Sequence, residues 1–292
     1  MTTGAEGRRS ARTSALLEAV DWLERRLAGC DEPRAVAEWA VAEAAGIGRA
    51  ALRAGLGGPL SQPAAARLEA MAERLAGGEP LAYVVGWAPF HGLRIAVDRR
   101  VLIPRPETEG LVELALEDLP TDRPVSVLDV GTGSGCIAAA VAWARPAAAV
   151  RATDTSPDAL EVAGANLRRL GLSDRIWLER GSLTGTAAPE SADLVMSNPP
   201  YVASHEWGWL ATSVRGWEPR EALDGGPDGL SVIRDLIPAA LSVLRQGGAV
   251  WMEIGEGHGA EVARLLAAAG FADVRIERDV TGRDRYAAGR RP

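Results

Sequence analysis

The chain has 292 residues, of which 47% are hydrophobic, enough to bury the core of one large domain and a smaller one. Its formal net charge of -7 argues against broad, non-specific attraction to nucleic acid phosphates and favours a protein or small-molecule substrate. Two isolated cysteines and three histidines without ligand spacing indicate neither a disulfide framework nor a zinc site, as is typical of a cytoplasmic protein.

The N-terminal region is predicted to be helical. Its first 14 residues are polar and lack the apolar segment of a signal peptide, so we expect a disordered tail. No later run is long enough to span a bilayer. Beyond the tail, apolar residues such as Leu16, Val20, Leu23 and Leu27 recur at helical spacing. We therefore predict a small all-helical domain over residues 1–80.

The period of the hydrophobic pattern changes after residue 80. Between Tyr83 and Ile103, apolar residues are interleaved with Gly86, Gly92 and Asp98, which predicts a pair of strands. We interpret residues 81–104 as a β-hairpin linker and residues 105–292 as the second domain.

This second domain alternates between predicted strands and helices, which is typical of a parallel sheet covered by helices. The last two strands, separated by a turn over residues 279–282, are expected to form an antiparallel edge. The predicted strands are 125–130, 150–153, 176–179, 193–197, 249–254, 272–277 and 285–289, and the predicted helices are 136–143, 158–170, 230–244 and 259–269.

The first of these strands leads into a glycine-rich turn, Gly131-Thr132-Gly133-Ser134-Gly135, which opens a helix. Glycines permit positive φ and let a ligand approach the backbone where open sheets bind their ligands. A tight turn without a ligand is the alternative, but the strand, turn and helix together favour a cofactor site. Asp154, at the end of the next strand, is suited to bind ribose hydroxyls.

The identity of the cofactor depends on the glycine spacing. A nicotinamide dehydrogenase would place its dinucleotide here, but Cys136 stands where the dinucleotide fingerprint has its third glycine. The pattern therefore favours another cofactor. Asp129, just before the turn, either pairs with an ammonium group such as that of a methionine moiety or caps the turn, and the sequence leaves both roles open.

A second motif, Asn198-Pro199-Pro200-Tyr201, follows a buried strand. Prolines carry no N–H, and their fixed φ holds the preceding carbonyls outward as acceptors. A conjugated NH2 group is a poor nucleophile because its lone pair is delocalised. We expect the Asn198 side-chain oxygen and the Pro199 carbonyl to accept its two hydrogens, while Tyr201 stacks on its plane. A simple loop breaker is the alternative.

The two motifs together resemble the class I S-adenosylmethionine-dependent methyltransferases. The resemblance implies S-adenosyl-L-methionine as cofactor, S-adenosyl-L-homocysteine as product, no metal, and a Rossmann-like sheet with an antiparallel C-terminal edge. A sulfonium methyl is already activated, so alignment suffices without a general base. The superfamily includes enzymes that methylate adenine amino groups, guanine amino groups and glutamine amides, so the motifs alone do not choose among them.

Three further stretches narrow the choice: VLIPRPETE over residues 101–109, EPREALDGG over residues 218–226 and GRDR over residues 282–285. They resemble the HemK/PrmC family of peptide-chain release factor glutamine methyltransferases. The resemblance runs from about Tyr83 to the C-terminus, and this family also carries a helical N-terminal region.

The resemblance implies a role for each motif. Residues Gly131 to Gly135 would wrap the methionine part of the cofactor and Asp154 would bind its ribose. Asn198 to Tyr201 would hold the substrate glutamine, with Asn198, Pro199 and Tyr201 catalytic and Asn198 also touching the cofactor. The family places an acidic residue and then a large apolar one beside the adenine. Here Ser182 and Leu183 stand there, so Leu183 keeps an apolar contact while an acceptor for the adenine amino group is lost.

The implied function is methylation of the glutamine amide in the Gly-Gly-Gln sequence of class I release factors, by a monomer that binds neither nucleic acid nor membrane directly. A glutamine methyltransferase for a ribosomal protein is the main alternative. A nucleic acid amino methyltransferase would need a basic face, and a non-catalytic binding module would not bind the cofactor. The loop over residues 202–226, with Trp207, Trp209 and Trp217, is either a lid or docking surface or a satellite core.

Overall fold

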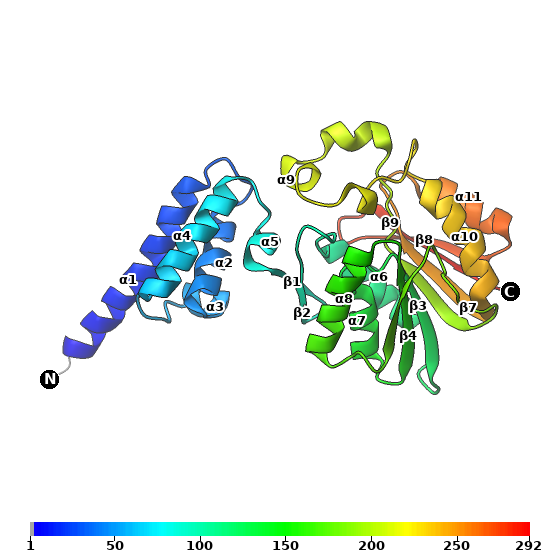
Figure 1. Cartoon of the computed structure of the whole chain (residues 1–292), viewed down its shortest axis with the longest axis horizontal. Coiled ribbons are helices and arrows are strands. Elements are labelled where there is room, and N and C mark those ends of the chain that lie inside the picture. The colour runs from blue at the N-terminus through cyan, green and yellow to red at the C-terminus, as the bar shows by residue number, and fades with distance from the viewer. Residues whose placement is uncertain (1–2) are drawn as a thin grey trace. The chain divides into compact units, whose positions relative to one another are not determined.

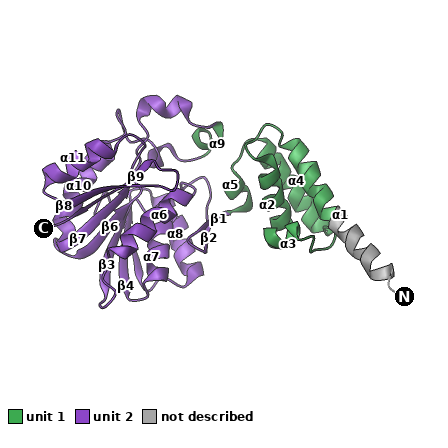
Figure 2. Ribbon diagram, turned by 180° about the vertical axis from the view of Figure 1, so that it is seen from behind, with its two compact units in different colours: residues 1–86, 212–217 green, residues 87–211, 218–292 purple. Residues whose placement is uncertain are grey.

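The computed structural model describes the backbone of residues 3–292 and the side chains of residues 15–292. The disordered tail predicted over residues 1–14 lies outside this full description. The chain forms two compact units: unit 1 contains Met1–Gly86 and Thr212–Trp217, and unit 2 contains Trp87–Ala211 and Glu218–Pro292 (Figure 2).

Unit 1 consists of helices packed around an apolar core, as the spacing of its leucines predicts (Figure 1). Val20, Leu23 and Val41 are fully buried there. The Ser61 hydroxyl caps the fourth helix by accepting a hydrogen bond from the Ala64 N–H at 3.4 Å. The helices are α1 (Thr3–Arg26), α2 (Pro33–Ala45), α3 (Arg49–Arg53), α4 (Gln62–Ala76), α5 (Leu81–Val85) and α9 (Thr212–Arg215).

The strand pair predicted from Tyr83 begins later than expected. Residues 81–85 form the short helix α5, which Gly86 ends with a φ of 85°. Tyr83 and Val84 favour strands by propensity, but one helical turn lets Val84 join the core of unit 1, and this packing decides the conformation. The hairpin then follows as β1 (Trp87–Phe90) and β2 (Leu93–Ala96), which pair antiparallel.

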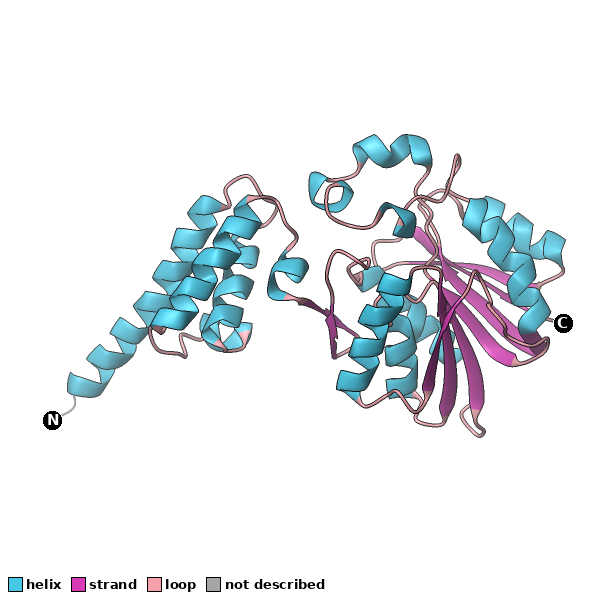
Figure 3. Ribbon diagram, in the orientation of Figure 1, coloured by secondary structure: helices cyan, strands magenta, loops and turns pink. Residues whose placement is uncertain are grey.

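Unit 2 is built on a seven-stranded mixed sheet with the order β5-β4-β3-β6-β7-β9-β8 (Figure 3). Strands β5 to β7 run parallel in this order, whereas β9 pairs antiparallel with both β7 and β8. The predicted Rossmann-like sheet and its antiparallel edge are confirmed. The strands are β3 (Val125–Val130), β4 (Ala148–Asp154), β5 (Ile176–Arg180), β6 (Ala192–Ser197), β7 (Leu244–Glu253), β8 (Ala272–Arg278) and β9 (Asp284–Arg290).

Helices cover both faces of this sheet (Figure 1). On one face lie α6 (Pro106–Glu117), α7 (Cys136–Ala144) and α8 (Pro157–Leu170), and on the other lie α10 (Ser231–Val243) and α11 (Gly259–Ala269). Helix α6 is absent from the sequence-based prediction, although it begins with a proline and carries glutamates in its first turn. No helix of the described chain is both long enough and apolar enough to traverse a bilayer.

The strand order locates the place where a ligand fits. From β3 the chain proceeds to β4 and β5 on one side, and it then crosses to β6 on the other side of β3, so the strand order reverses at β3. Such a switch point leaves a crevice at the carboxyl ends of the strands, where open α/β sheets bind ligands. The glycine turn follows β3 and the Asn-Pro-Pro-Tyr motif follows β6, so both motifs reach this crevice.

Candidate active site

A cavity of about 260 Å³ occupies the crevice. It brings together residues that the sequence predicted from separate motifs: Gly131, Gly133, Asp154, Leu183 and the motif segment 198–200. The lining also includes Leu102, Ser156, Ser182, Pro219, Ala222 and Val232. Every one of these residues belongs to unit 2.

The glycine turn presents open backbone to this cavity. The Gly131 N–H donates to the Thr153 carbonyl at 2.9 Å, and the Gly133 N–H donates to Asp154 Oδ2 at the same distance. Both glycines have positive φ, 71° and 54°, and a Cβ added to either would meet no atom within 4 Å. The turn is therefore fixed from behind and leaves room in front for a ligand.

Asp154 faces the cavity with capacity to bind hydroxyls. Its Oδ2 accepts from the Gly133 N–H and its Oδ1 accepts from the Ser156 N–H, both at 2.9 Å. Each carboxylate oxygen offers about two acceptor positions, so one on each oxygen remains. Two adjacent acceptors on one rigid carboxylate suit a pair of neighbouring hydroxyls such as those of a ribose.

Thr132, Ser134 and Gly135 lie beneath the turn and do not line the cavity. Thr132 is buried and its hydroxyl donates to Asp129 Oδ2 at 2.6 Å. Ser134 is also buried, and a Cβ on Gly135 would approach the Ala163 Cβ to 3.2 Å. The contacts of these three residues shape the turn and pack α7 against α8.

Asp129 has the geometry of a cap. Its Oδ2 accepts from the Thr132 hydroxyl and, at 3.1 Å, from the Ala138 N–H in the first turn of α7. Its Oδ1 is buried without a hydrogen-bond partner in the described structure. Burial raises the pKa of Asp129 to about 7. Asp129 is fully buried and does not line the cavity, so the structure favours capping over contact with an ammonium group.

Ser182 and Leu183 both line the cavity. Leu183 adopts a left-handed backbone conformation with a φ of 51°, and its carbonyl accepts from the Thr153 hydroxyl at 2.6 Å. A non-glycine residue in this region is strained and is held there by its surroundings. Ser182 supplies a hydroxyl where a carboxylate was expected in this family.

The Asn-Pro-Pro-Tyr motif forms the boundary between two hollows. A second, smaller cavity of about 30 Å³ is lined by Arg105, Tyr201 and Leu223, and it shares Leu102, Ala222 and the segment 198–200 with the larger one. Residues 198–200 of the motif therefore line both the larger cavity and the smaller one.

Behind the motif lies a network that sequence reasoning missed. Glu253, at the end of β7, is buried and accepts hydrogen bonds from the Tyr201 hydroxyl at 3.0 Å and from the Thr108 hydroxyl at 2.7 Å. Thr108 in turn accepts from Asn198 Nδ2 at 3.0 Å. Burial raises the pKa values of Glu253 and of Tyr201. The Arg285 guanidinium lies 6.0 Å from the centre of the Tyr201 ring.

Two of the stretches that carry the family resemblance meet at Glu218. Its carboxylate is almost fully buried, forms an ion pair with Arg105, and accepts from the Ile103 N–H at 3.0 Å. Arg105 lines the smaller cavity. Glu218 thus fixes the segment that closes this cavity opposite the motif, a role that neither stretch reveals alone.

Gly225 in this stretch and Gly229 just after it lie against the backbone of the motif. A Cβ on Gly225 would lie 2.7 Å from the Pro200 carbonyl oxygen, and one on Gly229 would lie 2.4 Å from that of Tyr201. The Gly225 N–H also donates to the Val202 carbonyl at 2.8 Å. Only glycine allows this close approach, which holds the motif rigidly.

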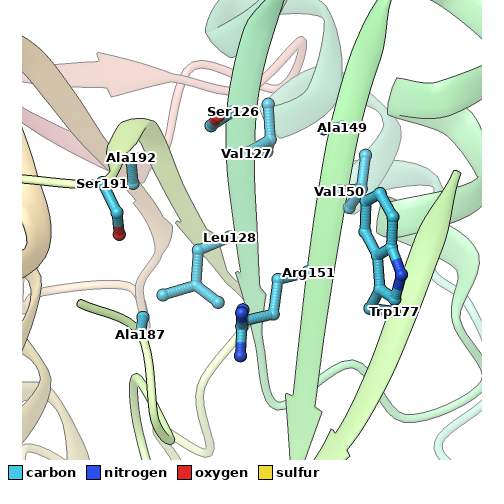
Figure 4. A pocket seen from close by; sticks show the side chains of 10 residues that line it. All are labelled: Ser126, Val127, Leu128, Ala149, Val150, Arg151, Trp177, Ala187, Ser191 and Ala192. Carbon is cyan, nitrogen blue, oxygen red and sulfur yellow. The ribbon is translucent and has the colours of Figure 1, made fainter.

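A further cavity of about 190 Å³ lies elsewhere on the sheet, among β3, β4, β5 and residues 187–192 (Figure 4). Leu128, Arg151 and Trp177 contribute side chains to it, and none of the predicted site residues does. Over the described residues, no group of three or more histidine, cysteine, aspartate or glutamate side chains is arranged to hold a metal ion. The crevice at the switch point is therefore the candidate active site.

Comparisons with known proteins identify families and relatives that the chain resembles. Residues 18–86 match the family described as PrmC N-terminal domain, and residues 111–213 match the family described as methyltransferase small domain. A release factor glutamine methyltransferase of Cereibacter sphaeroides is 45% identical over 265 residues, covering 91% of this chain and 94% of that protein. One of Geobacter sulfurreducens is 38% identical over 275 residues, covering 94% and 95%.

Solved structures resemble the chain in fold. The hMettl16 catalytic domain in complex with the MAT2A 3′UTR hairpin 6 has a TM-score of 0.55 and 19% identity, covering 80% of this chain and 84% of that one. A methyltransferase from Pyrococcus furiosus has a TM-score of 0.50 and 18% identity, covering 68% and 89%. At such identities the likeness concerns the fold alone.

Proposed function

The chain belongs to the family of release factor glutamine methyltransferases, and on this basis we propose that it methylates the side-chain amide nitrogen of a release factor glutamine with S-adenosyl-L-methionine. The observation that carries this proposal is the place of Asn198 and Pro199, which line both the larger cavity and the smaller one. We further propose that the glutamine belongs to a Gly-Gly-Gln sequence.

The residues around the larger cavity fit the cofactor. The open backbone at Gly131 and Gly133 accommodates the methionine part, Asp154 takes the ribose hydroxyls, and Leu183 provides an apolar contact for the adenine. Ser182 offers a hydroxyl in place of a carboxylate, so affinity for the adenine amino group depends on other contacts. When bound, the cofactor supplies a methyl group that its sulfonium has already activated.

The motif prepares the substrate nitrogen. In the smaller cavity, the Asn198 Oδ1 and the Pro199 carbonyl accept the two hydrogens of the glutamine amide, which fixes the rotation of the NH2 group. Tyr201 lines the same cavity and packs against the plane of the amide. Alignment of this kind contributes several kcal/mol to lowering a barrier, on the scale known for intramolecular reactions.

The rest of the chain serves recognition in this proposal. Unit 1 contacts the release factor, the chain acts as a monomer in the cytoplasm, and neither a metal ion nor direct binding of nucleic acid is involved. Residues 18–86, which match the N-terminal domain of the family, all lie in unit 1.

The proposal is tested with labelled S-adenosyl-L-methionine and, in separate reactions, a release factor, ribosomal proteins and DNA, followed by mass mapping of the modified residue. We expect label on one glutamine of the release factor. Label on DNA or on a ribosomal protein alone would refute the proposed substrate.

Replacing Asn198 tests the proposed chemistry. The Asn198→Ala variant should transfer methyl groups at least about 100-fold more slowly, the loss typical when one group that aligns a reacting centre is removed. Asn198 sits at the end of a strand, so the urea midpoint should change little. A variant that keeps its rate would show that the nitrogen is held by other groups.

A further inference from the structure

The hydrogen bonds behind the reaction motif have a defined direction. Glu253 is 1% exposed, and its two oxygens receive one hydroxyl each: Oε2 from Thr108 at 2.7 Å and Oε1 from Tyr201 at 3.0 Å. In its ionised form Glu253 only accepts hydrogen bonds, so in that form both hydroxyl hydrogens point toward Glu253. The Thr108 hydroxyl then has no hydrogen left for any other neighbour.

The orientation of the Thr108 hydroxyl determines the orientation of the Asn198 side-chain amide. This amide lies 3.0 Å from Thr108 Oγ1, which can now only accept. The amide of Asn198 must therefore turn its NH2 group toward Thr108. Its oxygen consequently turns away from Thr108, toward the side where the motif meets the cavities.

We propose that Glu253 and Thr108 are positioning residues that lock the Asn198 amide so that the substrate meets an acceptor rather than a donor. This inference rests on the proposed function and deepens it, because it explains how the site selects a glutamine amide. With the amide reversed, the substrate would meet an NH2 group, which repels the hydrogens of a glutamine but attracts the oxygens of a glutamate.

The surroundings of Glu253 support a fixed arrangement. The residue is closed off from solvent, so no water competes for its oxygens. Thr108 is 2% exposed and lies in the first turn of α6, a position fixed by the helix. Tyr286 adds a further support, since its hydroxyl donates to the Glu107 carbonyl at 2.7 Å beside Thr108. A buried network that is fully satisfied holds one geometry.

The central test replaces Thr108 by valine, which keeps its shape and removes its hydroxyl, and by serine, which keeps the hydroxyl. We expect Thr108→Val to lower kcat about tenfold, the value of one hydrogen bond, while Thr108→Ser stays close to the unmodified chain. The affinity for S-adenosyl-L-methionine, measured by calorimetry, should be the same in both variants because Thr108 does not line the larger cavity.

A second readout separates orientation from general damage. Binding is measured for a release factor and for a version whose acceptor glutamine is replaced by glutamate. The unmodified chain should prefer glutamine, and Thr108→Val should reduce this preference about tenfold, because a reversed Asn198 amide favours a carboxylate. Glu253→Met, which frees the Thr108 hydrogen to point at Asn198, should shift the preference in the same direction.

The outcomes distinguish the two levels of the proposal. The inference is wrong if Thr108→Val weakens the binding of the glutamine and the glutamate forms of the release factor equally. It is also wrong if Thr108→Val has the same kcat as Thr108→Ser. In either case Thr108 and Glu253 do not orient Asn198. If the unmodified chain neither binds nor methylates the glutamine form, the proposed function itself fails.

Discussion

Two buried carboxylates support the two halves of the candidate site. Asp129 lies beneath the glycine turn and binds the Thr132 hydroxyl, and Glu253 lies beneath the reaction motif and binds the hydroxyls of Thr108 and Tyr201. Burial raises the pKa of each. The charged form of each carboxylate therefore lowers the free energy of unfolding of the chain. A functional site accepts this cost because it needs polar groups in fixed positions.

Asp129 gives the chain a pH dependence of stability with a defined sign. Its pKa is about 7 in the folded chain against an ordinary value of 3.8, so the folded state holds the proton more tightly. The stability that this proton provides is complete below about pH 4 and is lost as the pH rises through about 7. In this window the free energy of unfolding should fall by up to about 1.4 kcal/mol per pH unit on account of Asp129.

The Asp129→Asn variant removes this titration. Urea unfolding between about pH 5 and about pH 7 should show a shallower decline of stability than in the unmodified chain. The matched control is Asp228→Asn: hydrogen bonds from Arg234 lower the pKa of Asp228 to about 2, so its curve should run parallel to that of the unmodified chain. If the stability of Asp129→Asn also declined with pH in parallel with the unmodified chain, the raised pKa would not belong to Asp129.

At the scale of elements, a loop after the reaction motif doubles back to hold it. The Val202 N–H donates to the Leu223 carbonyl at 2.9 Å, and the Gly225 N–H donates to the Val202 carbonyl. The carbonyls of Pro200 and Tyr201 lie against Gly225 and Gly229. The motif is thus clamped between its own strand β6 and the segment over residues 218–229.

Gly225→Ala tests this clamp. The added Cβ would lie 2.6 Å from the Gly229 oxygen and 2.7 Å from the Pro200 oxygen, both backbone atoms, so the motif must shift. Misplacement by about 1 Å costs on the order of 100-fold in rate, and we expect a loss of at least about tenfold in methyl transfer. Gly208→Ala in the same loop meets no atom within 4 Å and should keep its activity. Equal activity of the two variants would show that the clamp is not required.

The parts of the site that could be predicted from the sequence are those encoded locally. Residues 129–135 form strand and turn within one short segment, and the prolines at 199 and 200 constrain their own backbone. The network behind the motif joins Thr108 to Glu253 across 145 positions, and no local pattern records such a pairing. The prediction of a strand at Tyr83 and Val84 was wrong for a related reason. These residues form helix α5 because burial of Val84 in the core of unit 1 outweighs its propensity for strands.

At the scale of the whole molecule, the chain passes between its units three times, after residues 86, 211 and 217 (Figure 2). The second and third passages bracket Thr212–Trp217, which belong to unit 1 although they lie within the loop of the reaction motif. Inside unit 1, Trp217 lies near Gly78, where an added Cβ would be 4.0 Å from the indole nitrogen. The sequence indicated a long loop, but it did not indicate that residues 212–217 of this loop belong to unit 1.

The tryptophans of the loop differ in surroundings. Trp207 is half-buried, and the guanidinium of Arg220 lies over it, 4.9 Å from the centre of the Trp207 ring. Such packing is expected of a satellite core. Trp209 is 78% exposed, and its ring packs edge-on against the His205 ring, with the two ring centres 5.8 Å apart. An exposed tryptophan on the loop that follows the reaction motif is suited to contact a protein substrate.

Trp209→Ala should therefore raise KM for a release factor about tenfold, within the range of an interface anchor, while the urea midpoint and the affinity for S-adenosyl-L-methionine stay unchanged. Trp143→Ala is the matched control, because Trp143 is 58% exposed but lies near the end of α7 opposite the glycine turn. Trp207→Ala should instead lower the urea midpoint, since it removes the packing under Arg220. If Trp209→Ala and Trp143→Ala leave KM equally unaffected, the release factor is recognised elsewhere, and unit 1 becomes the surface to test next.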